Sequence, residues 1–125
     1  MAVIYQDVPL LPDEKIGHIN QSGHIYAYLE DNQEEYLGWV DYEEGVIYAG
    51  KQDDEEVVEM GWIEENGDVF ATYEEGEERL GYVDENGKLY AYTDEGDDYL
   101  GQVTDMTDAA EGAAAILFFF DEEEL

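Results

Sequence analysis

Ser22 and His24 are the first residues whose types could support catalysis, because a hydroxyl beside an imidazole is a pair that nucleophilic enzymes use. They lie in the segment Gln21-Ser22-Gly23-His24, and Ser-Gly is a common turn dipeptide. No oxyanion donors are indicated around them. We therefore expect an ordinary turn, and the sequence predicts no catalytic residue and no enzymatic activity.

His18 and His24 together raise the question of a transition-metal site, since imidazole is a common metal ligand. Two histidines need a third converging ligand, and the spacing places none. His18 also occupies the position that Trp39, Trp62 and Tyr82 hold in other copies of an internal repeat, so we expect a packed ring there. The sequence predicts no metal site and no cofactor.

Acidic pairs recur along the chain, and such pairs could bind hard cations or, within a cleft, hydrolyse glycosidic bonds. No loop has the alternating ligands, glycine and distal glutamate of a dedicated calcium site, and nothing in the sequence indicates a cleft. We expect solvated charge at two acidic poles, with weak binding of Ca²⁺ or Mg²⁺ as the alternative. The pairs near predicted turns are Glu43-Glu44, Glu64-Glu65 and Asp84-Glu85; those near predicted linkers are Glu34-Glu35, Asp53-Asp54-Glu55-Glu56, Glu74-Glu75, Glu77-Glu78, Asp94-Glu95 and Asp97-Asp98.

The charge balance restricts the classes of partner. The chain has 35 acidic residues against four basic ones, a formal net charge of -31. Neutralising phosphates requires clustered Lys and Arg, so we expect no binding to nucleic acid and none to an anionic membrane surface. A basic protein is the partner class that this charge favours.

A glycine, a larger residue and a β-branched residue return five times, at intervals of 20 to 23 residues. A period of this size indicates one small supersecondary unit that is repeated, and about 20 residues hold two short strands. We therefore predict tandem β-hairpins. The five copies are Gly17-His18-Ile19, Gly38-Trp39-Val40, Gly61-Trp62-Ile63, Gly81-Tyr82-Val83 and Gly101-Gln102-Val103.

The clearest copy sets a register. Asp84-Glu85-Asn86-Gly87 lies between two alternating segments, and we expect a type I turn with a G1 bulge that places Asp84 opposite Lys88. Gly17, Gly61 and Gly81 then each face an alanine, so we expect these glycines to line the crowded face where hairpins meet. The predicted pairs are Val83–Leu89, Tyr82–Tyr90, Gly81–Ala91, Leu80–Tyr92, Ile19–Ile25, His18–Tyr26, Gly17–Ala27, Ile16–Tyr28, Ile63–Val69, Trp62–Phe70, Gly61–Ala71 and Met60–Thr72.

The aromatic residues of the repeat have two interpretations. We expect cross-strand or core pairing, and the alternative is an exposed face that stacks on sugars or peptide side chains. The set comprises Trp39, Trp62, Tyr82, Tyr26, Tyr48, Phe70 and Tyr90.

The predicted fold is all-β, with four hairpins that begin near residues 16, 37, 60 and 80 closed into a pseudo-fourfold ring or barrel over residues 1–108. Closure removes exposed strand edges, so the ring is favoured over an open hairpin solenoid. The half-copy from Gly101 to Asp105 has no returning strand, and we expect it to pair with Val3-Ile4-Tyr5 and close the ring.

Residues 109–125 form a predicted tail that is Ala-rich, then strongly apolar, then acidic. Its apolar run from Ile116 to Phe120 is too short for periodicity to separate strand from helix. Five large apolar residues should be buried, either against the ring or in another subunit. A homo-oligomer formed through the tail is therefore one expectation.

The unit G-[YW]-[VI]-D-x-N-G-x-[LIV]-Y-A, iterated and followed by this tail, resembles the bacterial four-fold β-flower family over about Lys15 to Asp105 and the tail. The resemblance implies the ring fold and, because that family has no assigned function, implies no catalytic or ligand residue. A weaker likeness is to choline-binding cell-wall repeats, which share the period and the Gly-Trp pairs. This chain differs from them in its apolar tail and in having tryptophan only at 39 and 62.

The chain has no cysteine, which excludes disulfides and thiolate metal sites. The first residues lack the basic and apolar regions of a signal peptide, so we expect a cytoplasmic protein. The function predicted is that of a structural or protein-interaction module. The alternative is an acidic module that binds divalent cations or a basic protein.

Overall fold

A computed structural model describes residues 2–8, 10–29, 33–50, 57–73, 75–94 and 96–120 of the chain. These residues contain ten antiparallel strands and one helix. The strands are β1 (Ala2–Gln6), β2 (Glu14–Ile19), β3 (His24–Tyr28), β4 (Glu34–Asp41), β5 (Val46–Ala49), β6 (Val58–Ile63), β7 (Asp68–Tyr73), β8 (Gly76–Val83), β9 (Lys88–Thr93) and β10 (Gly96–Thr104), and the helix is α1 (Ala109–Phe119).

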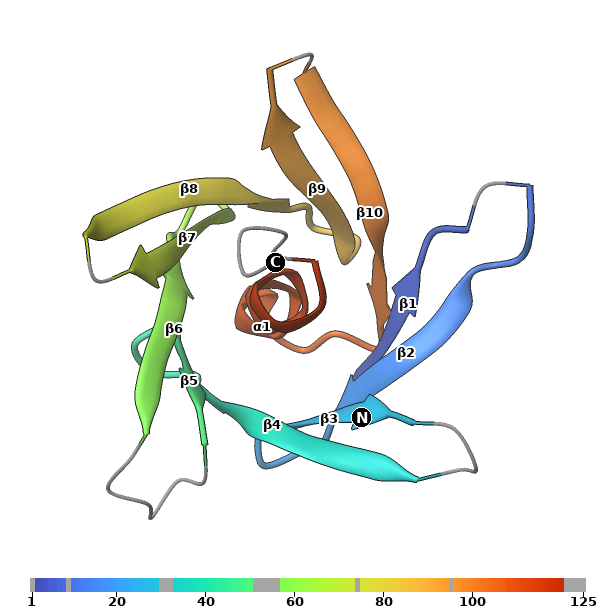
Figure 1. The fold of residues 1–125 in the computed structure, drawn as a ribbon, viewed down its shortest axis with the longest axis horizontal. Coiled ribbons are helices and arrows are strands. Elements are labelled where there is room, and N and C mark those ends of the chain that lie inside the picture. The colour runs from blue at the N-terminus through green and yellow to red at the C-terminus, as the bar shows by residue number, and fades with distance from the viewer. Residues whose placement is uncertain are drawn as a thin grey trace.

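The strands form one sheet that closes on itself around α1 (Figure 1). Each strand pairs with its neighbours in sequence, and residues 3–5 of β1 lie opposite residues 102–104 of β10. The predicted all-β closed ring is therefore confirmed, and the open solenoid is excluded. Because β10 and β1 form a fifth antiparallel strand pair beside the four tandem hairpins, the pseudo-symmetry of the described ring is closer to five-fold than to the predicted four-fold.

The tight turns are fixed by their own residues. In the turn between β8 and β9, Gly87 has a φ of +81° and its N–H donates to the carbonyl of Asp84 at 3.1 Å. The Asp84 carboxylate accepts from the N–H groups of Asn86 and Lys88, both at 2.9 Å. The carbonyl of Gly87 accepts from Val103 at 2.8 Å, and the carbonyls of the other turn glycines accept from the next hairpin in the same way: Gly23, Gly45 and Gly67. Each turn therefore also links neighbouring hairpins.

The register predicted within the first, third and fourth hairpins is confirmed from the glycine–alanine pair to the turn. The predicted pairs beyond the glycine, Leu80–Tyr92, Ile16–Tyr28 and Met60–Thr72, are wrong, because each strand leaves this partner at the glycine and continues along its other neighbour. Between hairpins there is a regular feature that the sequence reasoning missed, because one residue is skipped in the pairing before each repeat glycine. Such a bulge bends its strand from one partner toward the next. The skipped residues are all large and apolar: Ile16, Leu37, Met60, Leu80 and Leu100.

The strand pairs β1–β2, β3–β4, β5–β6, β7–β8 and β9–β10 project outward from the ring, and we call them the arms (Figure 1). The acidic pairs predicted at the linkers therefore lie along separate arms and do not gather at one pole. Glu34-Glu35, Glu77-Glu78 and Asp97-Asp98 are exposed arm residues. The pairs or parts of pairs at 53–56, 74 and 95 lie outside the described residues.

Helix α1 runs through the centre of the ring (Figure 1). It begins at a capping box, in which the Asp108 carboxylate accepts from the N–H of Ala110 and the Glu111 carboxylate accepts from the N–H of Asp108. The described part of the tail is therefore helical. Ile116 and Leu117 are buried against the ring of their own chain. Self-association through the tail stays a prediction.

The length of α1 is 11 residues. Among the described residues, no helix combines the length and apolar character needed to cross a bilayer.

The repeat glycines line the crowded face where neighbouring strands meet, as predicted, and three of them, Gly17, Gly38 and Gly61, also face the helix, which was not predicted. A Cβ on Gly17 would lie 2.6 Å from the ring of Phe119, and one on Gly61 would lie 3.1 Å from a methyl group of Leu117. At Gly81 and Gly101 the added atom would collide with a carbonyl oxygen of the neighbouring strand. The absence of side chains at these positions makes room for both the helix and the close strand pairing.

Leu10, near the end of the β1–β2 arm, is fully exposed and has a φ of +65°. A left-handed conformation is costly for leucine and is tolerated by asparagine. We expect Leu10→Asn to raise the free energy of unfolding by about 0.5–1 kcal/mol, because it relieves strain without exposing apolar surface. Denaturant unfolding measures this, and Leu11→Asn, at an exposed neighbour without positive φ, should give no gain.

Candidate functional site

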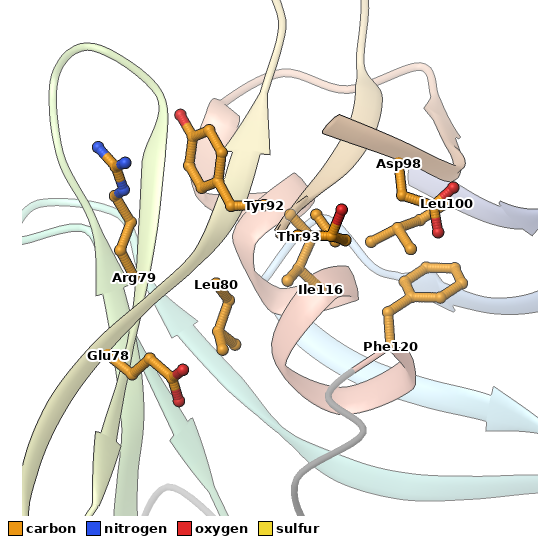
Figure 2. Close-up of a pocket in the computed structure, with 10 residues that line it drawn as sticks. Glu78, Arg79, Leu80, Tyr92, Thr93, Asp98, Leu100, Ile116 and Phe120 are labelled. Atoms are coloured by element: carbon orange, nitrogen blue, oxygen red, sulfur yellow. The ribbon is translucent and has the colours of Figure 1, made fainter. Parts of the chain in front are cut away.

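A cleft opens where the β7–β8 and β9–β10 arms diverge beside the end of α1 (Figure 2). Strands β8 and β9 pair only from Gly81 to Val83, after which each continues with its other neighbour. The resulting cleft has a volume of about 200 Å³. Its lining consists of Glu78, Arg79, Leu80, Ala91, Tyr92, Thr93, Asp98, Leu100, Ile116 and Phe120.

The floor of the cleft is apolar. Figure 2 shows Leu80 and Leu100 on either side of the helix, with Ile116 and Phe120 on its last turn and cap. Leu80 and Leu100 are the bulge residues of β8 and β10, so the bulges direct two leucines to the same place. The floor therefore offers apolar contact to a ligand that enters between the arms.

The rim of the cleft carries charge. Asp98 is exposed on one side, and it also borders an acidic hollow at the end of the β9–β10 arm with Asp94 and Asp97. Arg79 lies on the other side, with its guanidinium 4.2 Å from the centre of the Tyr92 ring and 3.6 Å from the Asp68 carboxylate. Glu78 also lines this side of the cleft, so carboxylates outnumber basic groups among the lining residues.

A second hollow of about 400 Å³ lies near the start of α1 and includes the buried Glu111. One oxygen of Glu111 accepts from the Tyr42 hydroxyl at 2.8 Å, and the other accepts from the Thr107 N–H at 2.7 Å. Burial and this hydrogen bond raise the pKa of Tyr42. Both carboxylate oxygens are engaged in joining the helix to the β4–β5 turn, so we assign Glu111 a structural role.

The residues that first suggested catalysis are not assembled into a catalytic site. The imidazole of His24 lies 3.2 Å from the hydroxyl of Tyr36. Asn20 accepts from the N–H groups of Ser22 and His24, which is ordinary turn chemistry as predicted. His18 stacks on Tyr26, with 5.0 Å between ring centres, and lies 3.6 Å from Glu34. His18 is therefore a packed ring in the position where other copies carry tryptophan or tyrosine.

The repeat aromatics pair across strands, and this prediction is confirmed for every copy that has two rings. Trp39 stacks on Tyr48, Trp62 on Phe70 and Tyr82 on Tyr90, with ring centres 4.5 to 5.2 Å apart. These rings are half-buried on the face of the sheet opposite the core. Each stacked pair uses one face of each ring, and the alternative of an exposed face that stacks on a ligand stays a prediction.

Among the described residues, no group of three or more His, Cys, Asp or Glu side chains is placed to hold a metal ion. Two turn aspartates, Asp41 and Asp84, instead accept hydrogen bonds from local backbone N–H groups. Binding of Ca²⁺ or Mg²⁺ stays a prediction without a preformed site in that part of the chain.

No protein-family model, curated protein or solved structure matches this chain. The resemblance of the repeat to the β-flower family stays a prediction for that reason. What can be inferred about function therefore depends on the geometry of the cleft and on the charge around it.

The cleft was not predicted from the sequence, although one signal for it was present. A large apolar residue precedes every repeat glycine, at the positions later found in the bulges. That recurrence could have been read as a second apolar position shared by all copies. It could not have shown that two of these residues meet the end of α1, because this depends on the helix lying inside the ring.

Two tyrosines on β8 and β9, Tyr82 and Tyr92, have raised pKa values. Partial burial and the hydrogen bond donated to Asp97 raise the pKa of Tyr82 to about 12, and similar causes raise the pKa of Tyr92, whose hydroxyl donates to Asp68. The folded state then keeps a proton that the unfolded chain releases near pH 10, so stability should fall as the pH rises from about 10 to 12.

We expect Asp97→Asn to lower the pKa of Tyr82, because the amide removes the negative charge that disfavours tyrosinate. Following the ring carbon that carries the hydroxyl by NMR during an alkaline titration measures this pKa. Tyr82→Phe identifies the signal, and an unchanged Tyr82 titration in the Asp97→Asn variant would contradict the assigned hydrogen bond.

Proposed function

We propose that this protein is a non-enzymatic interaction module whose partner is a basic protein or peptide. The observation that supports this most is the imbalance of 35 acidic residues against four basic ones. Some of the described acidic residues, such as Glu34, Glu77 and Asp97, are exposed on the arms that project outward from the ring (Figure 1). Like charges at this density attract cationic partners and accelerate their encounter. The closed ring holds the arms apart.

The described basic residues do little to offset the acidic surface. Lys15 and Lys88 are single exposed residues on β2 and β9, and Arg79 is engaged by Asp68 and Tyr92. At physiological salt the screening length is about 8 Å, so carboxylates along one arm still act together on an approaching cation.

Binding of a fluorescent lysine-rich peptide tests this function. We expect binding at about 0.05 M monovalent salt, with Kd rising at least about tenfold by 0.5 M, because the interaction is mainly electrostatic. A peptide of equal length with glutamate in place of lysine is the control and should not bind. Absence of binding at low salt, or affinity that does not change with salt, would contradict the proposal.

A further inference from the structure

We infer that the cleft between the β7–β8 and β9–β10 arms binds one large apolar side chain of a basic peptide, with the flanking basic residues of that peptide lying on the acidic rim. This inference rests on the proposed function and names the segment that such a partner presents. It depends on three features of the cleft: its size, the chemistry of its floor and the charge around it.

The size of the cleft favours a side chain over a small molecule. Sites for small molecules commonly enclose about 300–1,000 Å³. The cleft has a volume of about 200 Å³, which suits a single leucine, methionine or phenylalanine side chain. It lies where the two arms diverge, so we place the peptide backbone across the gap between them.

The floor gives this side chain an apolar environment. Leu80 and Leu100 are half-buried and Ile116 is almost fully buried, and all three pack against the hydrophobic core. They are held by the bulges and by the helix rather than by a mobile loop. An apolar side chain that enters the cleft therefore gains contact with a preformed surface, which limits the entropy lost on binding.

The surroundings of the floor favour cations beside the apolar side chain. Asp98 borders the cleft, and Asp97 and Asp94 continue from it along the β9–β10 arm. The last turn of α1 contains no basic residue, so the partial negative charge at the end of the helix is not neutralised there. Charge therefore selects a basic segment, and the floor selects an apolar residue within it.

Arg79 does not oppose this arrangement. Figure 2 shows its guanidinium beside the Tyr92 ring, away from Leu100 and Phe120. The contact with Asp68 at 3.6 Å balances its charge. Asp98 and Arg79 belong to different arms, since Asp98 lies on β10 and Arg79 lies on β8. A cationic residue of the peptide can therefore approach the Asp98 carboxylate without lying beside Arg79.

Two peptides test the inference. One has a phenylalanine between two pairs of lysines, and the other has glycine in place of the phenylalanine, so their charges are equal. We expect the phenylalanine peptide to bind the full chain at least about tenfold more tightly, because it buries an aromatic side chain. Its preference should persist at salt concentrations that release the glycine peptide.

The binding position is tested by NMR and by two charge reversals. The phenylalanine peptide should shift the methyl signals of Leu80, Leu100 and Ile116 and leave those of the exposed Leu10 unchanged. Asp98→Lys should weaken binding at least about threefold more than Glu85→Lys, which makes the same charge change in the exposed turn at the far end of the β8–β9 pair.

The outcomes separate the inference from the proposed function. Equal affinity for both peptides, with strong salt dependence, would overturn the cleft assignment and leave the electrostatic function standing. Tighter binding of the phenylalanine peptide without methyl shifts in the cleft would also overturn the assignment. If neither peptide binds at low salt, both the inference and the proposed function are wrong.

Discussion

Replacing Gly81 with alanine is expected to destabilise the protein by at least about 3 kcal/mol. The added methyl group would collide with the carbonyl oxygen of Tyr90 and lie 3.0 Å from the Cα of Ala91. Both atoms belong to the backbone of β9, so a side-chain rotation cannot relieve the overlap. The strands would have to separate at the point where β8 pairs with both of its neighbours. Chemical denaturation measures the change.

Gly76→Ala provides the matched comparison. Gly76 lies at the outer start of β8 with a φ of +140°, and no atom lies within 4 Å of an added Cβ. The substitution there should cost about 1 kcal/mol, from backbone strain alone. Similar losses for the two variants would mean that the repeat glycines are not required by close packing.

Deleting residues 113–125 is expected to abolish cooperative unfolding, because the ring loses the centre of its hydrophobic core. The deletion removes Ala113, Ala114, Ala115, Ile116 and Leu117, which are all buried. Without them, residues such as Val69 and Leu89 would face an empty space that a ring of short hairpins cannot close. Calorimetry of the shortened chain should show no sharp transition.

Leu117→Ala tests the same claim in a chain that still folds. It should lower the free energy of unfolding by about 2–5 kcal/mol, since Leu117 is 1% exposed. Leu11→Ala makes the same chemical change at an exposed position and should alter stability by less than about 0.5 kcal/mol. A sharp melt in the deleted chain, or equal effects of the two alanine variants, would contradict a core built around α1.

The hairpins were predictable because their turns are chemically explicit. Asp84 and Gly87 determine a turn through local hydrogen bonds and one positive φ, and the register follows by counting along the two strands. The bulge at Leu80 was not predictable in this way. It arises where β8 stops pairing with β9 and pairs only with β7. The residues of a single hairpin do not indicate where this change of partner occurs.

The apolar run of the tail does not by itself determine its secondary structure, but the residues before the run do. The apolar run from Ile116 to Phe120 suits either a strand or a helix, so periodicity could not decide. Asp108 and Glu111, three residues apart before that run, form the capping box of a helix and were a readable signal. The place of the helix inside the ring follows from packing between distant segments, and the cleft beside Leu100 depends on it.

The central claim is that α1 fills the ring of its own chain, and NMR cross-peaks test it most directly. The structure predicts contacts between the Gly17 Cα protons and the Phe119 ring, and between Gly112 and the methyl groups of Val83. In a mixture of isotope-labelled and unlabelled chains, these cross-peaks should arise within single chains. Their absence, or their appearance only between chains, would contradict the account and would favour a helix exchanged with another copy.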